Sequence, residues 1–211
     1  MVSERTIERF SLYRRVVEEL RKEGVAGIHS HRLAERAGAS AAQVRRDLMS
    51  LSVVGHPKRG YDTADLLAGL GGFLDAPEGQ NAALIGVGNL GRALLAYFQR
   101  RRPNLQIVAA FDSDPSKIGR LIHGCPCYAV EELPNIVREE SISIGMLTVP
   151  ASAAHEAAGR LIRAGVGGLL NFAPVHLRVD ERIYVEDIDI TMHLEKVAWF
   201  AREKSGGKGR S

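Results

Sequence analysis

A glycine-rich motif between a strand and a helix constrains the fold of this chain more than any other feature. The pattern G-x-G-x-x-G directly follows an apolar run that begins at Ala83, and a helical pattern follows it. The first glycine permits a tight turn, the second lets backbone approach a pyrophosphate, and the third allows close packing of helix on strand. We predict a dinucleotide site, with a merely tight strand-to-helix turn as the alternative. The motif consists of Gly86, Val87, Gly88, Asn89, Leu90 and Gly91.

An acidic residue at the end of the next apolar run supports the dinucleotide interpretation. Asp112 lies 21 positions beyond the third glycine and ends the run 107–112. A carboxylate at this place accepts hydrogen bonds from the adenosine ribose hydroxyls, and it repels a 2′-phosphate. No arginine follows immediately to compensate that repulsion. We therefore expect NADH/NAD⁺ rather than NADP as the cofactor.

Strands and helices alternate from residue 80 to residue 190, which predicts an α/β domain with a Rossmann-type, doubly wound parallel sheet. The expected strands lie near 82–86, 107–112, 143–149, 168–171 and 183–190, and the expected helices near 89–100, 131–140 and 152–164. Open sheets of this kind bind ligands at the carboxyl ends of their strands. The residues predicted there are Thr148, Val149, Pro150, Asn171 and Phe172. For Asn171 and Phe172, loop packing and cofactor contact remain equal alternatives.

The length of 211 residues suits two domains, because single domains commonly have about 100–150 residues. The turn-forming segment 75–80 is the expected linker after a first domain at 1–76. No apolar run reaches the roughly 20 residues that a membrane helix needs, and the N-terminus has no apolar signal segment. We expect a cytoplasmic protein without a membrane partner. Residues 1–62 carry 12 Lys and Arg against eight Asp and Glu, whereas the remainder carries 16 against 17, which favours a polyanionic partner for the first domain.

The first domain has the pattern of a winged helix-turn-helix. Apolar residues at helical spacing predict a helix over 4–23, and a second helix is expected at 31–37 with Ser30 as its N-cap. Ser40 is the expected N-cap of a third helix, and Gln43 completes a capping box. The broken, basic stretch 53–62 predicts a hairpin or wing, and a further helix is possible near 63–74.

The third helix of this pattern is the expected DNA-reading helix. Val44, Leu48 and Leu51 share the face that packs inward, while Gln43 and Arg46 lie on the opposite face, where either can contact a base in the major groove. A solvated charged face is the alternative. The residues expected at DNA are Ser40, Gln43, Arg45 and Arg46 in the helix, and Lys58, Arg59 and Tyr61 in the wing, of which Tyr61 could simply anchor the wing.

The chain ends in a helical pattern at 191–204, followed by a tail at 205–211 that is expected to be disordered. The helix is apolar over so much of its surface that one sheet would not cover it, which predicts an interface element. Cys125 and Cys127 are interpreted as small apolar residues of strand structure, with a redox or metal role as the alternative. We expect neither a catalytic nor a metal site. The apolar residues of the final helix are Met192, Leu194, Val197, Ala198, Trp199 and Phe200.

Together these stretches resemble the Rex family of redox-sensing transcriptional repressors from Thr6 to about Arg202. The matching segments are 43–48, 86–91, 111–115 with Lys117 and Gly119, 147–150, 171–174 and 185–189. The resemblance implies a homodimer that binds a palindromic double-stranded operator when NAD⁺ prevails and releases it when NADH binds. It also implies a C-terminal helix swapped into the partner subunit, and it adds Lys117 to the cofactor site. The candidate switch is Asp189, reached across the dimer, with Tyr97 or Arg15 as its partner, and Trp199 belongs to the interface.

The wing departs from the family pattern, because the usual Gly, any, Arg-Gly, any, Gly-Tyr is here Gly55-His-Pro-Lys-Arg-Gly60-Tyr61. The operator preference is therefore expected to differ from the family consensus.

Two other functions share parts of this pattern. An NAD-dependent oxidoreductase has the same glycine motif, but it needs a substrate domain and a proton donor, and the seven His residues are scattered without a partnered acid or base. His176 is the best placed of them and is interpreted as a loop residue. A nucleotide-binding module of the CoA-ligase type would match the second domain alone, and the helix-turn-helix argues against it.

Overall fold

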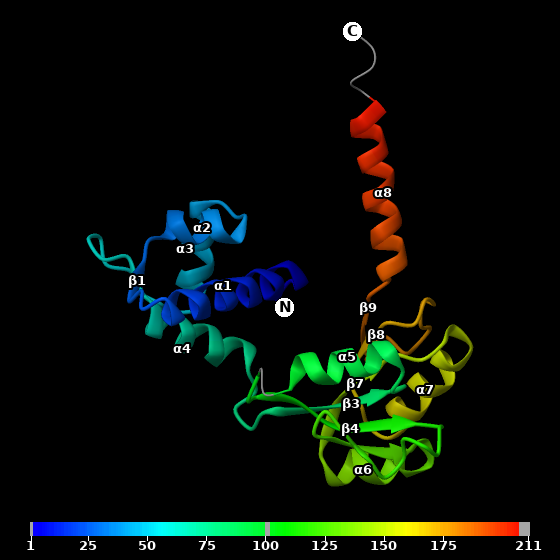
Figure 1. Ribbon diagram of the computed structural model, residues 1–211. Helices are drawn as coiled ribbons and strands as arrows, with labels where there is room; N and C mark the ends of the chain where they lie inside the picture. Colours follow the sequence, from blue (N-terminus) through cyan, green and yellow to red (C-terminus); the bar gives the residue numbers. More distant parts are fainter. Residues whose placement is uncertain (1, 100–101, 207–211) are drawn as a thin grey trace. The chain divides into compact units, whose positions relative to one another are not determined.

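The computed structural model describes residues 2–99 and 102–206. The chain forms two compact units that join between Glu78 and Gly79, inside the segment expected to be the linker. Figure 1 follows the chain from one unit to the other.

The first unit is a small helical domain with a short two-stranded sheet. Its helices are α1 (Glu4–Lys22), α2 (Ser30–Ala37), α3 (Ala41–Ser50) and α4 (Thr63–Leu74). The strands β1 (Gly27–Ile28) and β2 (Tyr61–Asp62) pair antiparallel, so the segment before α2 is joined to the segment after the wing. This arrangement confirms the winged helix-turn-helix, including the helix near 63–74.

One apolar cluster holds these four helices together. Its fully buried side chains come from every helix of the unit, and Phe10 in α1 also packs edge-on against Phe73 in α4, with ring centroids 4.9 Å apart. Burying one such side chain stabilises a fold by about 1.5–3 kcal/mol. The fully buried members are Phe10, Tyr13, Val17, Leu33, Val44, Leu48, Leu66 and Leu70.

The second unit is built on a seven-stranded sheet with the order β5-β6-β4-β3-β7-β8-β9. All neighbouring strands are parallel except β5 and β6, which are antiparallel at one edge. The order from β6 to β9 is that of a doubly wound Rossmann sheet, as the sequence predicted. The strands are β3 (Gln80–Ile85), β4 (Leu105–Asp112), β5 (Leu121–Ile122), β6 (Cys125–Ala129), β7 (Ile142–Leu147), β8 (Gly168–Asn171) and β9 (Tyr184–Asp187).

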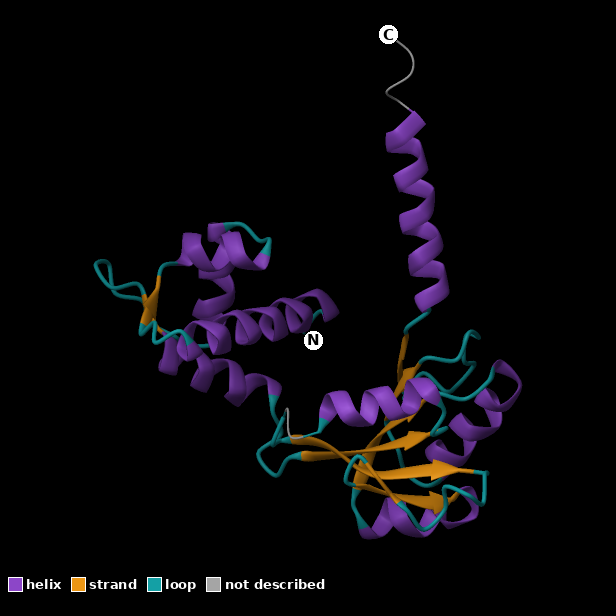
Figure 2. Ribbon diagram, viewed as in Figure 1, coloured by secondary structure: helices purple, strands orange, loops and turns teal. Residues whose placement is uncertain are grey.

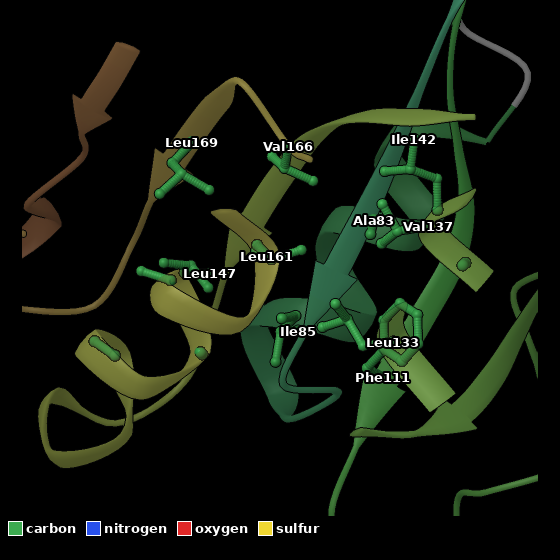
Figure 3. Packing of buried hydrophobic residues seen from close by; sticks show 14 of the residues in the cluster. Ala83, Ile85, Phe111, Leu133, Val137, Ile142, Leu147, Leu161, Val166 and Leu169 are labelled. Atoms are coloured by element: carbon green, nitrogen blue, oxygen red, sulfur yellow. The ribbon is translucent and has the colours of Figure 1, made fainter. Parts of the chain in front are cut away.

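Helices cover both faces of this sheet (Figure 2). On one face, α5 (Asn89–Phe98) packs through Leu95 against strand residues such as Leu84. On the other face, α6 (Leu133–Glu139) and α7 (Ala151–Arg163) enclose the larger cluster, in which Phe111 and Leu161 are fully buried (Figure 3). Alternate residues of the central strands serve the two faces, which is why these strands are nearly continuous apolar runs.

The last helix, α8 (Ile190–Gly206), leaves the sheet after β9 (Figure 1). Its described side chains, which extend to Lys204, are all exposed, although several are large and apolar. Trp199 and Phe200 contact each other with ring centroids 4.9 Å apart, and Trp199 is still 50% exposed. Within the part of the chain that the structure describes, no helix combines the length and the hydropathy needed to cross a membrane.

Several expected boundaries were wrong. His29 rather than Ser30 is the N-cap of α2, because Ser30 already has helical geometry. The helix expected at 131–140 is split into a 3-10 turn, Val130–Glu132, and α6. The final helix continues to Gly206, so the tail expected from residue 205 is helical at its start, and residues 207–211 lie outside the described chain. Residue 100, at the expected end of the helix over 89–100, also lies outside it.

Candidate functional site

A cavity of about 730 Å³ opens at the carboxyl edge of the sheet, where β3, β4 and β7 end. Its walls come from the glycine motif, the ends of these strands, the turn after β6 and the first turns of α7. The cavity is lined by Ile85, Gly86, Gly88, Asn89, Leu90, Asp112, Ser113, Lys117, Val130, Glu131, Thr148, Val149, Pro150, Ala153, Glu156, Ala157, Arg160 and Phe172.

The glycine motif has the geometry that its sequence predicted. Gly86 has a φ of +97°, and a Cβ there would lie 2.7 Å from the carbonyl oxygen of Thr148. A Cβ at Gly91 would lie 2.2 Å from the carbonyl oxygen of Gly86, so the third glycine is required for close packing. A Cβ at Gly88 would meet nothing within 4 Å, because this residue faces the open cavity. Gly88 is also the N-cap of α5, without a side-chain cap, so the first N–H groups of the helix are available to a phosphate.

Thr148 fixes the position of this loop. Its hydroxyl donates to the carbonyl oxygens of Ile85 and Gly86, at 3.1 Å and 2.7 Å. Its backbone N–H also donates to the Ile85 carbonyl, at 2.9 Å. The end of β7 therefore holds the start of the glycine loop, while Thr148 itself lines the cavity.

Asp112 is buried at the end of β4 and accepts hydrogen bonds from three donors. Oδ2 accepts from the Val87 N–H at 2.7 Å and from Lys117 Nζ at 3.0 Å, and Oδ1 accepts from the Asp114 N–H at 2.9 Å. Burial opposes the charge of Asp112, but these hydrogen bonds outweigh it and lower the pKa of the carboxyl. The carboxylate is therefore ionised and ties the glycine loop to β4.

Lys117 partly compensates the charge of this carboxylate. The sequence has no arginine directly after Asp112, but the Lys117 ammonium group reaches Oδ2 and also lies 3.6 Å from Asp114 Oδ2. The hydrogen bond to Asp112 raises the pKa of Lys117, which keeps it cationic. The cavity thus presents an anion and a cation side by side, and its repulsion of a 2′-phosphate is weaker than a lone carboxylate would give.

Three of the residues predicted to bind cofactor do not line the cavity. Val87 is buried beneath the loop, and Gly91 packs on the strand. Asn171 is fully buried: its Nδ2 donates to the Val175 carbonyl and to Asp187 Oδ1, both at 2.8 Å, and its Oδ1 accepts from the Ala173 N–H. Loop packing, one of the two alternatives left open for Asn171, is what the geometry supports, whereas Phe172 lies in the cavity wall.

Several lining residues escaped the sequence analysis. Ser113 follows Asp112, and Val130 and Glu131 follow β6, which was missing from the strands expected for the sheet although Cys125 and Cys127 were interpreted as strand residues. Four more lie on α7, where the sequence shows mainly alanines on the inward face. Two of these four lining residues form an ion pair, in which Arg160 donates to Glu156 Oε1 at 2.9 Å and 3.1 Å. For Val130 and Glu131 the available signal was the interpretation of Cys125 and Cys127 as strand residues, which was not extended to the residues that follow them. The residues missed are Ser113, Val130, Glu131, Ala153, Glu156, Ala157 and Arg160.

His176 has an acidic partner, contrary to the expectation that no histidine does. Its Nδ1 lies 2.6 Å from Asp187 Oδ2, and the other oxygen of Asp187 accepts from Asn171. The His176 side chain is 80% exposed and does not belong to the cavity wall. The pair orders the loop after β8 and does not face the cofactor cavity.

Cys125 and Cys127 lie in β6 and are both buried, as the strand interpretation expected. Burial raises the pKa of the Cys125 thiol to about 12 and also raises that of Cys127. Thiols in this state are protonated and weakly reactive at neutral pH.

The winged-helix unit presents a second candidate site, the exposed face of α3. Arg45, Arg46 and Met49 are exposed there, and Met49 is 75% exposed. Ser40 is the N-cap, and its side chain accepts from the Gln43 N–H at 3.1 Å. The sequence placed these residues on the correct face.

The capping box was wrong in its second half, because Gln43 does not reach back to Ser40. Its Nε2 donates to Asp47 Oδ1 at 2.8 Å, and its Oε1 accepts from Arg46 Nη2 at 2.9 Å. Asp47, which the sequence analysis did not single out, is only 6% exposed on the inward face of α3. Its place three residues after Val44 and directly before Leu48, on the apolar face of the helix, was the signal that could have identified it.

The wing is a tight loop closed by two backbone hydrogen bonds between His56 and Gly60, at 2.7 Å and 2.8 Å. Lys58 and Arg59 lie exposed within this loop. Tyr61 is half-buried in the pairing of β2 with β1 and packs against the apolar cluster. The geometry therefore supports Tyr61 as the anchor of the wing.

The four switch and interface residues lie apart in sequence. Arg15 is exposed on α1, and Tyr97 is 50% exposed on α5. Asp189 precedes α8, and its Oδ1 accepts from the Met192 N–H at 2.9 Å, so it caps that helix. Trp199 is exposed on α8 itself.

Two families match parts of the chain. Residues 78–175 match the family described as "CoA binding domain", and residues 1–48 match "Putative DNA-binding protein N-terminus". Together they cover the sheet from β3 to β8 and the first unit through most of α3, whereas β9 lies beyond the matched residues.

Relatives and solved structures match both units at once. "Redox-sensing transcriptional repressor Rex" of Carboxydothermus hydrogenoformans is 37% identical over 201 residues, which are 95% of this chain and 97% of the relative. The protein of the same name from Listeria monocytogenes (strain EGD-e) is 37% identical over 199 residues, 94% and 93% of the two chains. The crystal structure of "RSP in complex with beta-NAD+ and operator DNA" has a TM-score of 0.87 at 31% identity and covers 99% of this chain and 96% of its own. That of "RSP in complex with beta-NADH" has a TM-score of 0.84 at 31% identity, with 99% and 98% covered.

Proposed function

This chain belongs to the Rex family of redox-sensing transcriptional repressors, and we propose that it binds a palindromic operator as a homodimer and leaves it when NADH fills the Rossmann cavity. The observation that carries the proposal is that one chain joins a winged helix-turn-helix to a nucleotide-type cavity, and that the relatives extend over both.

The cavity residues fit a dinucleotide. Gly88 leaves room for a pyrophosphate at the N-terminus of α5, and Asp112 lies at the carboxyl end of the next strand, where it meets an adenosine ribose. Thr148, Val149, Pro150 and Phe172 then line the part toward the nicotinamide. We assign NADH and NAD⁺ as the ligands, in agreement with the complexes of RSP.

The DNA surface consists of the exposed face of α3 and the wing. Arg46 provides donors for base edges in a major groove, and Lys58 and Arg59 provide charge for phosphates. Binding to a two-fold site needs two copies of this surface, about 34–36 Å apart for adjacent major grooves. The exposed apolar face of α8 supports the homodimer, because a partner subunit would cover it.

The redox signal must come from the nicotinamide end of the cavity. NADH differs from NAD⁺ by a hydride and by loss of the positive charge on the ring. A contact that forms differently in the two states would rotate the subunits and change the spacing of the recognition helices. Asp189, with Tyr97 or Arg15 of the dimer as its partner, is the proposed contact.

We place the protein among regulators rather than enzymes. The second unit contains one Rossmann sheet and one helix beyond it in the described residues, and the His176–Asp187 pair lies outside the cavity wall. A DNA partner supports a cytoplasmic location, which we include in the proposal. NADH consumption with 2-oxo acids should be undetectable, and steady turnover would contradict a purely regulatory role.

An operator titration tests the proposal. A two-fold site is first selected from random duplex DNA with the full-length protein and NAD⁺. We expect tight binding to that site with NAD⁺ or without cofactor, and release on addition of NADH. Equal affinity in all three conditions would contradict it.

A further inference from the structure

The inward face of α3, the proposed DNA-reading helix, contains a buried carboxylate that has no role in the proposed function described above. Asp47 lies among the fully buried Val44 and Leu48, and its side chain is 6% exposed. A buried charge is strongly unfavourable unless it is paired and hydrogen-bonded. Its donors therefore indicate what it does.

The Asp47 carboxylate accepts four hydrogen bonds. Oδ2 accepts from Arg9 Nε at 2.7 Å and from the Tyr13 hydroxyl at 2.9 Å. Oδ1 accepts from Arg9 Nη2 at 2.9 Å and from Gln43 Nε2 at 2.8 Å. Three donated bonds come from α1 and one from α3 itself, so Asp47 joins the supporting helix to the recognition helix.

The chemistry of Asp47 fixes the direction of the Gln43 amide. An ionised carboxylate only accepts hydrogen bonds, so the NH₂ group of Gln43 must face it and the carbonyl oxygen must face away. Burial opposes ionisation of Asp47, but the bonds from Arg9, Gln43 and Tyr13 outweigh it and lower its pKa. The orientation of Gln43 is thus set by charge.

The freed carbonyl oxygen of Gln43 then holds Arg46. Gln43 Oε1 accepts from Arg46 Nη2 at 2.9 Å. An arginine has five N–H donors in a rigid fork, so the other donors of the exposed Arg46 remain for a base. In contrast, a bidentate contact of Gln43 with adenine would compete with the partners that its Nε2 and Oε1 already have.

We propose that Asp47 is a positioning residue that acts through Gln43 to hold Arg46 for guanine, and that Gln43 is a support rather than an independent reader of a base. This inference rests on the proposed function, because it assumes that α3 reads DNA. It changes the expected base preference of the operator. Residues 43, 46 and 47 together would select guanine at one position of each half-site, instead of contacting separate bases.

A scan of base preference at each operator position tests this expectation. The full-length protein and its variants are measured against the selected site and single-base changes of one half-site, with NAD⁺ present. Arg46→Ala should reduce the preference for guanine at one position by about 10-fold or more. Gln43→Ala and Asp47→Asn should relax that same position, to a smaller extent, and should leave the other positions unchanged.

Val44→Ala is the matched control, because it weakens packing in the same helix without touching this network. It should lower the thermal midpoint but keep the guanine preference. If Asp47→Asn fails to fold, Gln43→Ala decides, since it leaves the Arg9–Asp47 pair intact.

Two results would overturn the inference while leaving DNA reading by α3 intact. One is that Gln43→Ala relaxes a different position and leaves the guanine preference unchanged. The other is that Val44→Ala relaxes the same position as the network variants, which would reduce the effect to general loosening of the helix. A wild-type protein that selects no two-fold site would overturn the proposed function as well.

Discussion

Two buried carboxylates, Asp47 and Asp112, lie beneath the two proposed binding surfaces. Each is ionised because its hydrogen bonds outweigh the cost of burial. Asp112 ties the glycine loop to β4 through the Val87 N–H, and Asp47 joins α1 to α3. Each carboxylate therefore holds the backbone or side chains of its site in position, in addition to any direct contact with the ligand.

Replacing Asp112 tests cofactor choice. Asp112→Ala should weaken NADH binding, because a ribose contact and the support of the loop are both lost. It should also narrow the advantage of NADH over NADPH, since Lys117 would then face the ribose without its carboxylate. Fluorescence titration with both cofactors measures the effect.

Asp114→Ala is the control for that variant. It removes the longer contact between Lys117 and Asp114, but it keeps the hydrogen bond from the Val87 N–H to Asp112. It should change the NADH/NADPH ratio less than Asp112→Ala does. If NADPH already binds the unaltered protein as well as NADH does, the role assigned to Asp112 is wrong.

Acid should reveal the contribution of Asp47 to stability. Its pKa is lowered in the folded state from an ordinary value of 3.8, so it stabilises the fold above that value and loses this contribution as the pH falls through the lowered pKa. The free energy of unfolding of wild type should therefore exceed that of Asp47→Asn by a constant amount above about pH 5 and converge on it below pH 4. A difference that does not change with pH would contradict the ion pair.

At this scale, sequence patterns located the residues of local motifs but not those defined by tertiary contacts. Gly86, Gly91 and Asp112 follow from a motif with a fixed backbone geometry. The environment of Asp47 depends on Arg9, 38 positions away, and Arg160 lines the cavity only because α7 packs against the sheet beside it. Neither relation has a local signature.

Among the elements, the central strands and the helices of the helix-turn-helix were predictable because periodicity and glycine punctuation agree there. Strand β6 was missing from the expected sheet, although its two cysteines were interpreted as strand residues, because Cys125-Pro-Cys127 is short, contains proline and carries no alternating pattern. Its place beside β4 at the edge of the parallel sheet is set by pairing with Asp112 and its neighbours. The two residues that line the cavity after it were missed for the same reason.

The recognition helix and the wing should contribute differently to DNA binding. Arg46→Ala should cost about 1–3 kcal/mol at one position of each half-site, whereas Lys58→Ala should weaken all sequences alike and lower the salt slope by about 1. The reason is that Arg46 lies on the exposed face of α3 that we propose reads DNA, and Lys58 lies in the exposed loop of the wing. Salt-dependent titrations on specific and random DNA separate the two, and equal effects of both variants on both DNAs would refute the distinction.

The final helix should hold the dimer together. Truncation after Ile190 removes nearly all of α8 and its exposed apolar residues, so it should yield monomers that fail on a two-fold operator. Glu195→Ala, on the same helix but outside the apolar set, should leave the dimer intact. Sedimentation that finds the truncated protein still dimeric would exclude α8 as the interface.

For the whole molecule, the two units meet in sequence at a short segment, and Arg14 on α1 binds Asp75 at the start of it, with Nη1 and Oδ1 2.6 Å apart. The proposed cofactor site and the proposed DNA surface belong to different units of the chain, so we propose that NADH changes DNA affinity through the dimer. In this proposal, NADH and operator DNA stabilise two different arrangements of the dimer, and the free-energy difference between these arrangements couples the two sites.

Such coupling is reciprocal, which makes NADH affinity in the presence of DNA the most direct test of redox sensing. The dissociation constant of NADH is measured for the full-length protein with no DNA, with the selected operator at saturation, and with an unrelated duplex as control. The account predicts that the operator weakens NADH binding by the same factor by which NADH weakens operator binding, about 5- to 150-fold, and that the unrelated duplex has little effect. An NADH affinity that the operator leaves unchanged would mean that the protein binds both ligands without sensing one through the other.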